Sequence, residues 1–275
     1  MSLLAAIASS RRRASVAYDT DAQSYFTAVE AVSSIGTVAK NAANALIVGL
    51  KADGLWTLIH QLYLYAGPNT LAGALVKARG SGTRVNNGFV SGDFSPTLGL
   101  QGNGTSKSIT NGFLTNQFSA NSHSIFVYSS SGFIISSVDT ILCGSYNNTG
   151  VGSLILDAYT VYVSGRAFRS AQLNPGLFPV FTTGLTTSGS IMGSRTTSSM
   201  AKIYQDGIYK AQNTSSISPS FSNLDFSSFG LNTNGTVVAW SPDRRQVEAF
   251  TQGLDDTQAG QLHNRVTSYV NALNY

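Results

Sequence analysis

The stretch Ile203–Lys210, with the sequence IYQDGIYK, carries the strongest signal for the fold. Two arms rich in β-prone residues flank the dipeptide Asp206-Gly207. Asp-Gly is a preferred pair for a two-residue type I′ turn, because both central residues of that turn need positive φ angles. The stretch therefore predicts a tight antiparallel β-hairpin.

Outward from this hairpin, short β-prone runs continue from about Leu75 to Gly253. Clusters of Gly, Asn, Ser and Pro separate the runs, a pattern typical of an all-β sandwich or barrel. This part of the chain is expected to fold as two packed antiparallel sheets. The other predicted strands are Ser124–Tyr128, Leu154–Leu156, Thr160–Val163, Val180–Thr182 and Val237–Trp240.

Helices are expected on both sides of the β region. From Thr37 to Tyr65 several leucines recur every four residues, and Gly54 is expected to divide this stretch into two helices, with Trp56 packed in the core near the elbow. Towards the end of the chain, Asp255 and Gln258 have the spacing of a capping box, and an apolar stripe at helical spacing follows them. This last helix is expected to lie against the sandwich or the N-terminal helices.

The composition excludes several classes of partner. Only 11% of the 275 residues are charged, so uncharged polar side chains must supply much of the surface. The net charge is +4, but the basic residues are scattered except at Arg11–Arg13, and no nucleic-acid partner is expected. No apolar run approaches the ~18 residues that span a bilayer, so no membrane partner is expected. The single cysteine, Cys143, lies in an apolar run and is expected to be a buried small hydrophobe.

No set of residues predicts catalysis or a cofactor. A glycosidase normally needs two carboxylates that flank the scissile bond. The two glutamates are Glu30, outside the β region, and Glu248, just before the last helix. The histidines His60, His123 and His263 lack the spacing of a zinc site. We therefore expect no catalytic residue, no cofactor and no metal site.

Two loop segments have the composition of a glycan-binding surface, which needs an exposed aromatic ring among planar polar groups. In the first, Tyr146 is followed by Asn147 in an Asn-rich turn. In the second, Trp240 precedes Asp243 where a predicted strand ends. For Trp240 the alternative is a residue at the edge of the core.

Several segments resemble a family of phage structural proteins with a concanavalin-A/laminin-G-like domain. They are Val38–Tyr63, Gly99–Thr105, Ile203–Gly207 and Arg244–Asp256 with the helix that follows, and the resemblance extends over nearly all of residues 37–275. The chain departs from the family pattern at Tyr63–Gly67. The shared motifs are structural, so they imply a fold and a virion context and carry no catalytic residues.

This resemblance implies a mainly β fold, a jelly-roll sandwich with a small N-terminal helical module and a C-terminal helix. The expected organisation is an arm at residues 1–23, the helical module at 24–74, and the sandwich with its last helix at 75–275. The implied function is a non-enzymatic structural protein on the particle surface, in a tail, a fibre or a head decoration. Its partners would be other virion proteins and host surface glycans, and homo-oligomerisation is left open.

Two alternatives come from other functional classes. The first is a polysaccharide-degrading tail enzyme on the same sandwich, which the shortage of paired carboxylates disfavours. The second is a secreted calcium-dependent lectin. Calcium needs several clustered oxygen ligands, so this alternative requires the fold to gather Asp139, Asp157 and Asp225.

The N-terminal arm is predicted to dock on a neighbouring virion subunit. Its apolar residues Leu3, Leu4 and Ile7 would supply contact area, and the cluster Arg11, Arg12 and Arg13 would meet acidic groups and set orientation and association rate. The alternative is a disordered terminus whose arginines only increase solubility.

Deletion of residues 2–13 separates these alternatives. If the arm docks, the truncated protein should remain folded and soluble but should no longer be incorporated into particles. The melting temperature of the isolated protein should barely change, because the arm is expected to have no core partner within its own chain. Normal incorporation of the truncated protein would contradict docking.

Overall fold

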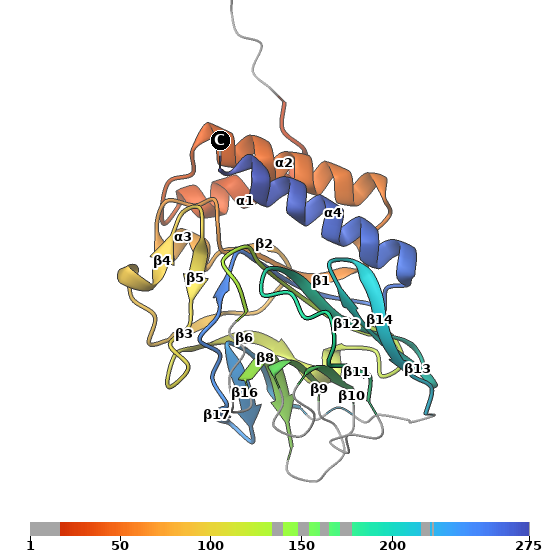
Figure 1. Ribbon diagram of the computed structural model, residues 1–275. Coiled ribbons are helices and arrows are strands. Elements are labelled where there is room, and N and C mark those ends of the chain that lie inside the picture. Colours follow the sequence, from red (N-terminus) through yellow and green to blue (C-terminus); the bar gives the residue numbers. More distant parts are fainter. Residues whose placement is uncertain are drawn as a thin grey trace, which may run out of the picture.

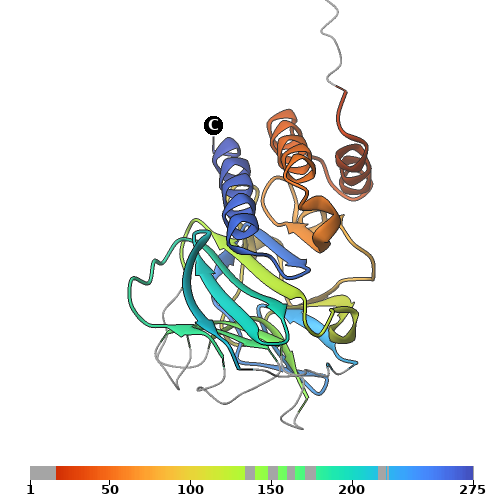
Figure 2. The same cartoon turned by 90° about the vertical axis from the view of Figure 1, so that its right-hand side faces the viewer.

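The computed structural model describes residues 17–133, 140–147, 154–159, 165–170, 178–215, 221 and 223–274. Three layers make up these parts of the chain (Figure 1). A layer of helices covers one face of a seven-stranded sheet, and a nine-stranded sheet lies on its other face. Viewed from the side, the long helices lie next to one another above the sandwich (Figure 2). The mainly β sandwich expected from the sequence is therefore confirmed.

The long helices are α1 (Thr20–Glu30), α2 (Thr37–Ala52) and α4 (Asp256–Ala272), and α3 (Leu71–Ala74) is a single turn. The 3₁₀ turns are η1 (Trp56–Leu58), η2 (Ser91–Asp93) and η3 (Thr115–Gln117). Among the helices that the structure describes, none is long and apolar enough to cross a membrane.

The seven-stranded sheet has the order β14-β13-β12-β7-β19-β1-β2. Its strands are β14 (Ile208–Asn213), β13 (Met200–Gln205), β12 (Gly189–Thr197), β7 (His123–Ser129), β19 (Val247–Thr251), β1 (Ile59–Leu64) and β2 (Lys77–Arg79). Every neighbouring pair in this order is antiparallel.

The nine-stranded sheet has the main order β11-β10-β9-β8-β15-β6-β3, with β16 and β17 branching from β8. Its strands are β11 (Val180–Phe181), β10 (Arg166–Ser170), β9 (Leu154–Tyr159), β8 (Thr140–Tyr146), β15 (Asp225–Ser228), β6 (Ser108–Leu114), β3 (Val85–Asn87), β16 (Gly230–Thr233) and β17 (Thr236–Val238). The pair β16–β8 is parallel, an exception in an otherwise antiparallel arrangement of the described strands. A small sheet contains β18 (Arg244–Arg245), β5 (Gly99–Gln101) and β4 (Phe94–Ser95).

The seven-stranded sheet separates two hydrophobic cores. Because successive side chains of a strand point to opposite faces, Leu62 and Leu64 of β1 belong to the core beneath the helices, whereas Tyr63 belongs to the core between the sheets. In β7, Phe126 joins the helical core and Val127 joins the core between the sheets. This sheet is therefore buried on both faces.

The helices are held to the sheet by apolar stripes. On α2, Ala43, Ile47 and Leu50 are fully buried. The predicted capping box of α4 is confirmed, because Asp255 accepts a hydrogen bond from the backbone of Gln258 and the two residues bond reciprocally. The predicted contact of the last helix with the N-terminal helices is also confirmed by the packing of α4 on α2.

The hairpin predicted at residues 203–210 is present. Strands β13 and β14 pair with Gln205 opposite Ile208. The turn residues Asp206 and Gly207 have φ angles of 55° and 72°, so both adopt the positive values that a type I′ turn requires. Predicted strands over 124–128, 154–156, 180–182 and 237–240 correspond to β7, β9, β11 and β17, whereas 160–163 lies outside the described residues.

Two sequence expectations in the first 65 residues are wrong. The second predicted helix is instead the strand β1, so His60 lies on a strand. A leucine spacing of four residues, as between Leu58 and Leu62, fits a strand period of two as well as a helix period of 3.6. In addition, β1 is buried on both faces, so it lacks the alternation of polar and apolar residues that identifies a strand. In addition, α1 begins at Thr20, within the segment assigned to the arm.

A buried polar network joins the two sheets at Glu248, a fully buried residue of β19. The hydroxyl of Tyr65 donates to Oε2 of Glu248 at 2.6 Å. The hydroxyl of Ser228 and the thiol of Cys143 both donate to Oε1, at 2.7 Å and 2.8 Å respectively. Arg245, also fully buried, places a guanidinium nitrogen 4.0 Å from Oε1. Burial, and then the charge of Glu248, raise the pKa of the Cys143 thiol. Cys143 is thus buried, as expected, and protonated.

The first prediction from the fold concerns this network. Glu248→Ala should lower the free energy of unfolding by about 3–5 kcal/mol, because it leaves the Arg245 charge and several buried donors without their acceptor. The chain's other glutamate provides the control. Glu30→Ala, which removes a partly exposed partner of Lys40, should cost at most about 1 kcal/mol. Urea unfolding of both variants measures the difference, and equal losses would contradict the prediction.

The second prediction concerns His123, which is fully buried at the start of β7 and hydrogen-bonds through Nδ1 to the carbonyl oxygen of Ser119. Burial lowers its pKa from 6.5 to about 3. Below pH 6.5 the unfolded chain takes up a proton that the folded chain does not, so stability present above pH 6.5 is lost as the pH falls. This one group should contribute a loss of roughly 1.4 kcal/mol per pH unit.

His123→Phe tests this, because it removes the titration and keeps an aromatic ring among Phe118, Phe168 and Phe221. Its free energy of unfolding should fall less steeply between pH 6.5 and pH 5 than that of the unsubstituted protein. The histidines that remain have the same sign of effect in both proteins, so only the difference in slope matters. Identical slopes would refute the assignment.

Candidate functional site

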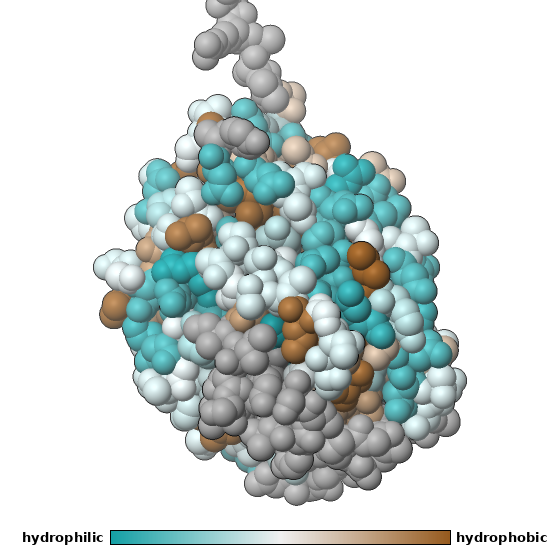
Figure 3. Space-filling model, in the orientation of Figure 1, coloured by the Kyte–Doolittle hydropathy of each residue, from teal (hydrophilic) through white to brown (hydrophobic). Residues whose placement is uncertain are grey.

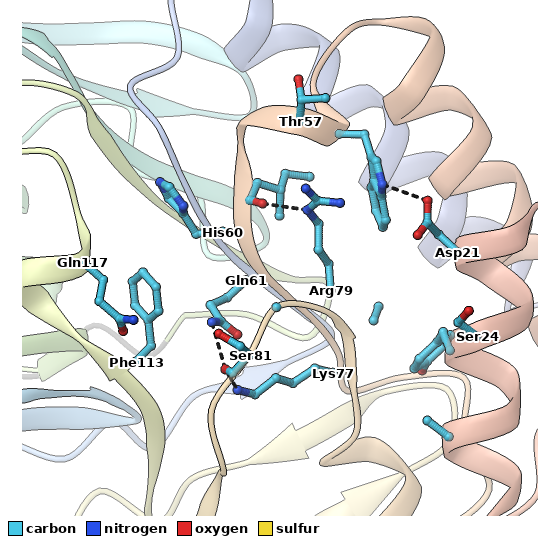
Figure 4. A pocket seen from close by; sticks show the side chains of 16 residues that line it. Asp21, Ser24, Thr57, His60, Gln61, Lys77, Arg79, Ser81, Phe113 and Gln117 are labelled. Atoms are coloured by element: carbon cyan, nitrogen blue, oxygen red, sulfur yellow. Dashed lines mark hydrogen bonds between the residues drawn. The ribbon is translucent and has the colours of Figure 1, made fainter.

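A groove with a volume of about 690 Å³ runs between α1 and the edge strand β2. We call it the α1–β2 groove. Its walls come from α1, η1, β1, β2 and the residues that follow them, together with β6 and η3. His60, Phe113 and Gln117 lie towards one end of the groove, and Asp21 and Ser24 lie at the other (Figure 4).

A stacked pair, Trp56 and Arg79, lies in this groove. Trp56 is only 6% exposed, and its indole N–H donates to Oδ2 of Asp21 at 3.1 Å. The guanidinium of Arg79 lies 4.7 Å from the indole ring centre, in the range of a cation–π contact. Arg79 is also tethered by its Nε, which donates to the carbonyl oxygen of Ile59 at 2.7 Å (Figure 4). Two contacts therefore fix the guanidinium in place.

The carboxylate of Asp21 forms an ion pair with a lysine that does not line the groove. Nζ of Lys51 lies 2.6 Å from Oδ2 of Asp21 and 2.6 Å from Oδ1 of Asp19. The hydrogen bond from Lys51 lowers the pKa of Asp19, and both aspartates raise the pKa of Lys51. Asp21 is therefore committed to Lys51 and Trp56.

Polar side chains lie along β1 and β2. Gln61 is buried, and its Nε2 donates to the carbonyl oxygen of Ser81 at 3.1 Å. Lys77 donates to the carbonyl oxygens of Ser81 and Gly82. Burial, and then the charge of Arg84, lower the pKa of Lys77 to about 8, so its ammonium group is charged at pH 7.

His60 is neutral at pH 7. Its ring is half-buried and stacks on Phe113 with the centres 5.9 Å apart. Burial, and then the charge of Arg79, lower its pKa below 6.5. Its Nε2 is buried and has no hydrogen-bond partner among the described residues.

The groove thus combines two cations, a neutral imidazole and amide groups with a single lining carboxylate, Asp21. Such a set can bind hydroxyl groups and anions. It does not provide the pair of carboxylates that glycoside hydrolysis normally uses. The chain's two glutamates lie elsewhere: Glu248 is in the core between the sheets, and Glu30 is paired with Lys40.

The glycan-binding residues expected from the sequence are not brought together. Tyr146 and Asn147 are half-buried at the end of β8, where the carbonyl oxygen of Tyr146 accepts from the backbone of Asn234. Trp240 follows β17 at the opposite end of β8, since the neighbouring Ala239 accepts from the backbone of Ile141. Nε1 of Trp240 is buried, and the residue as a whole is half-buried.

Asp243 does not reach the surface. It is fully buried and accepts a hydrogen bond of 2.7 Å from the hydroxyl of Ser241. The predicted contact of Asp243 with a glycan therefore finds no exposed carboxylate in this structure. The docking residues Leu3, Leu4, Ile7 and Arg11–Arg13 lie outside the described residues.

Among the described residues, no group of His, Cys, Asp and Glu side chains is arranged to hold a metal ion. Asp157 is fully buried and paired with Arg169 at 2.5 Å. Asp157 and Asp225 lie on strands that flank β8 on opposite sides. Asp139 is outside the described residues.

Sequence reasoning placed Trp56 in the core, which is correct, but it missed the groove. The available signal was the pair Lys77 and Arg79, two residues apart and therefore on one face of a strand. That signal was hidden because β2 has only three residues. The stack depends on Trp56, which reaches Arg79 only after the chain has folded.

The fold resembles solved domains of sugar-processing proteins. Domain 4 of AbnA, a GH43 extracellular arabinanase from Geobacillus stearothermophilus in complex with arabinotriose, matches 75% of this chain and 99% of its own length, with 14% identity and a TM-score of 0.50. A sialidase from Trypanosoma rangeli matches 77% of this chain with 11% identity and a TM-score of 0.50. This chain covers only 33% of that sialidase chain. No protein-family model and no curated protein sequence matches the chain.

Proposed function

We propose that this protein is a non-enzymatic glycan-binding β-sandwich displayed on the surface of a phage particle. The observation that carries the binding function is the α1–β2 groove, in which an immobilised aromatic–guanidinium pair lies beside amide and imidazole groups. Sites for small ligands are usually concave and combine apolar walls with a few fixed polar groups. The likeness to a single domain that was solved with bound arabinotriose gives independent support.

The groove is a better candidate than the two loop segments expected from the sequence. In the groove, residues from distant parts of the chain converge on one hollow. By contrast, Tyr146 and Trp240 lie at opposite ends of β8, and Asp243 is buried. A sugar ring needs several contacts at once, and among the described residues of the two segments Tyr146, Asn147 and Trp240 are only half-buried.

The absence of catalysis is proposed from the carboxylates that the structure describes. Asp21, the lining carboxylate of the groove, is bonded to Lys51 and to Trp56. Glycoside hydrolysis normally uses a pair of carboxylates that flank the scissile bond, and Asp21 has no second carboxylate beside it in the groove lining. A polysaccharide-degrading enzyme is therefore the alternative that the binding experiment below must also exclude.

The placement on a virion rests on the resemblance of residues 37–275 to phage structural proteins. In this proposal the sandwich faces the medium and the N-terminal arm attaches it to other virion proteins. Several large hydrophobic residues of the described chain are exposed, among them Val38 and Val90. On the face shown in Figure 3, hydrophobic residues form small separate patches among hydrophilic ones, and such patches need no partner.

Obstruction of the groove tests the proposed site. Ala28 of α1 lines the groove and is exposed, so Ala28→Trp should fill part of the space and weaken binding to host surface polysaccharide at least about tenfold. Gln23→Trp is the matched control. Gln23 is an exposed residue of the same helix outside the groove lining, and its replacement should leave affinity unchanged.

Titration of immobilised polysaccharide with the three proteins gives the affinities, and an assay for new reducing ends on the same material detects cleavage. Equal binding by all three proteins would move the site away from the groove. No binding by the unsubstituted protein would contradict glycan binding altogether. Release of reducing ends would replace the proposed function with the enzymatic alternative.

A further inference from the structure

We infer that the α1–β2 groove selects acidic saccharides, whose carboxylate or sulfate group binds to the free end of the Arg79 guanidinium. This inference rests on the proposed function and makes it more specific. It starts from an arginine that is held in place by the fold but has no anionic partner among the described residues.

The state of Arg79 differs from that of Arg265. In Arg265, Nε and Nη2 donate to the two carboxylate oxygens of Asp53 at 2.7 and 2.9 Å, which is the usual forked pairing. In Arg79, Nε is occupied by the carbonyl oxygen of Ile59, and neither Nη atom has a hydrogen-bond partner in the described part of the chain. The remaining donors therefore form an unoccupied fork at the end of the side chain.

This fork is preorganised. The stack on Trp56 and the bond to Ile59 hold the guanidinium, and the bond from the indole to Asp21 holds Trp56 in turn. Because the Arg79 side chain is already ordered, it loses less conformational freedom when a ligand binds than a flexible surface arginine would. Loss of that freedom is a main reason why exposed ion pairs contribute little.

The charge balance of the groove favours an anion. Arg79 and Lys77 both line it, and neither is paired with a carboxylate among the described residues. Asp21 is the one carboxylate of the lining, so the lining carries two cations against one anion, and Asp21 also shares the ammonium group of Lys51 with Asp19. The burial that lowers the pKa of Lys77 to about 8 shows that its charge is partly desolvated, and an anionic ligand would offset that cost.

The rest of the groove suits a saccharide better than a bare ion. Its volume of about 690 Å³ is within the range of pockets that hold small organic ligands. Away from the Arg79 fork, the exposed side chain of Gln117 lies towards the other end of the groove, where its amide N–H groups can donate to hydroxyl groups (Figure 4).

The charges of Lys77 and Arg79 could also serve a role other than ligand binding, and an experiment must distinguish the two roles. β2 is the edge strand of the seven-stranded sheet, and charged residues on an edge strand discourage pairing with other chains. That role requires only charge, so Arg79→Lys would fulfil it. Recognition by a fork requires the planar guanidinium, which lysine does not provide.

The experiment compares four full-length proteins by calorimetric titration: the unsubstituted chain, Arg79→Lys, Arg79→Gln and Lys210→Gln. Lys210 lies on β14, outside the groove, and its replacement matches the charge change of Arg79→Gln. The probes are a uronic-acid tetrasaccharide and its carboxyl-reduced form, a sulfated tetrasaccharide and its desulfated form, and sodium sulfate alone. Melting temperatures confirm that each variant is folded.

The unsubstituted protein should bind at least one acidic probe about 10- to 100-fold more tightly than its neutral form, the range expected for a charge-assisted bond. Arg79→Gln should abolish that preference, Arg79→Lys should retain only a minor part of it, and Lys210→Gln should retain all of it. If Arg79→Lys and the unsubstituted protein bind the acidic probes with equal affinity, recognition by the guanidinium fork is contradicted. The charge of Arg79 would then serve only to protect the edge strand.

The remaining outcomes distinguish this inference from the proposed function. Equal affinity for acidic and neutral forms, with binding lost in Ala28→Trp, would overturn the acidic preference and leave the proposed glycan site in place. Binding of sulfate as tight as that of the sulfated saccharide would show an anion site without sugar recognition. Failure of every acidic probe, while host polysaccharide still binds in the groove, would also overturn the acidic preference.

Discussion

The burial of the seven-stranded sheet on both faces is the constraint on which the rest of the structure depends. Strand β19 shows it residue by residue. Val247 and Ala249 belong to the helical core, while Phe250 belongs to the core between the sheets. A sheet in this position must present apolar side chains in both directions, as sheets covered on two faces generally do. The helices are therefore needed to cover one of these faces and are not an appendage to a sandwich that is complete without them.

The same constraint explains the polar network around Glu248. A carboxylate that points from the central sheet into the core between the sheets cannot reach water, so neighbouring strands must supply its partners. They do so through Tyr65, Ser228 and Cys143. Such networks depend strongly on geometry, because each donor is costly to bury unless it is paired. This requirement favours a single register between the two sheets, whereas apolar contacts alone tolerate small shifts.

Local signals made part of this fold predictable. The turn at Asp206-Gly207 and the cap at Asp255 depend on residues a few positions apart, and both were correctly read from the sequence. Strand β1 was not predicted, because its partner β19 comes from a distant part of the chain and its hydrophobic residues match both helix and strand periods. Similarly, Asp243 is fully buried and bonded to Ser241, which a sequence pattern of aromatic and polar residues does not reveal.

The groove could not be predicted either, because only the fold brings its lining residues together. Its positive charge follows from the way the few carboxylates of the chain are distributed. The chain has 17 Lys and Arg residues and 13 Asp and Glu residues. Among the described residues, Asp53, Asp93 and Asp256 are used in ion pairs with Arg265, Lys107 and Lys202. The pairs of Asp53 and Asp256 connect elements that are distant in sequence, so these carboxylates are committed to tertiary contacts. The cations of β2 are left without acidic partners beside a hollow, and a surface poor in carboxylates acquires a local positive site there through folding alone.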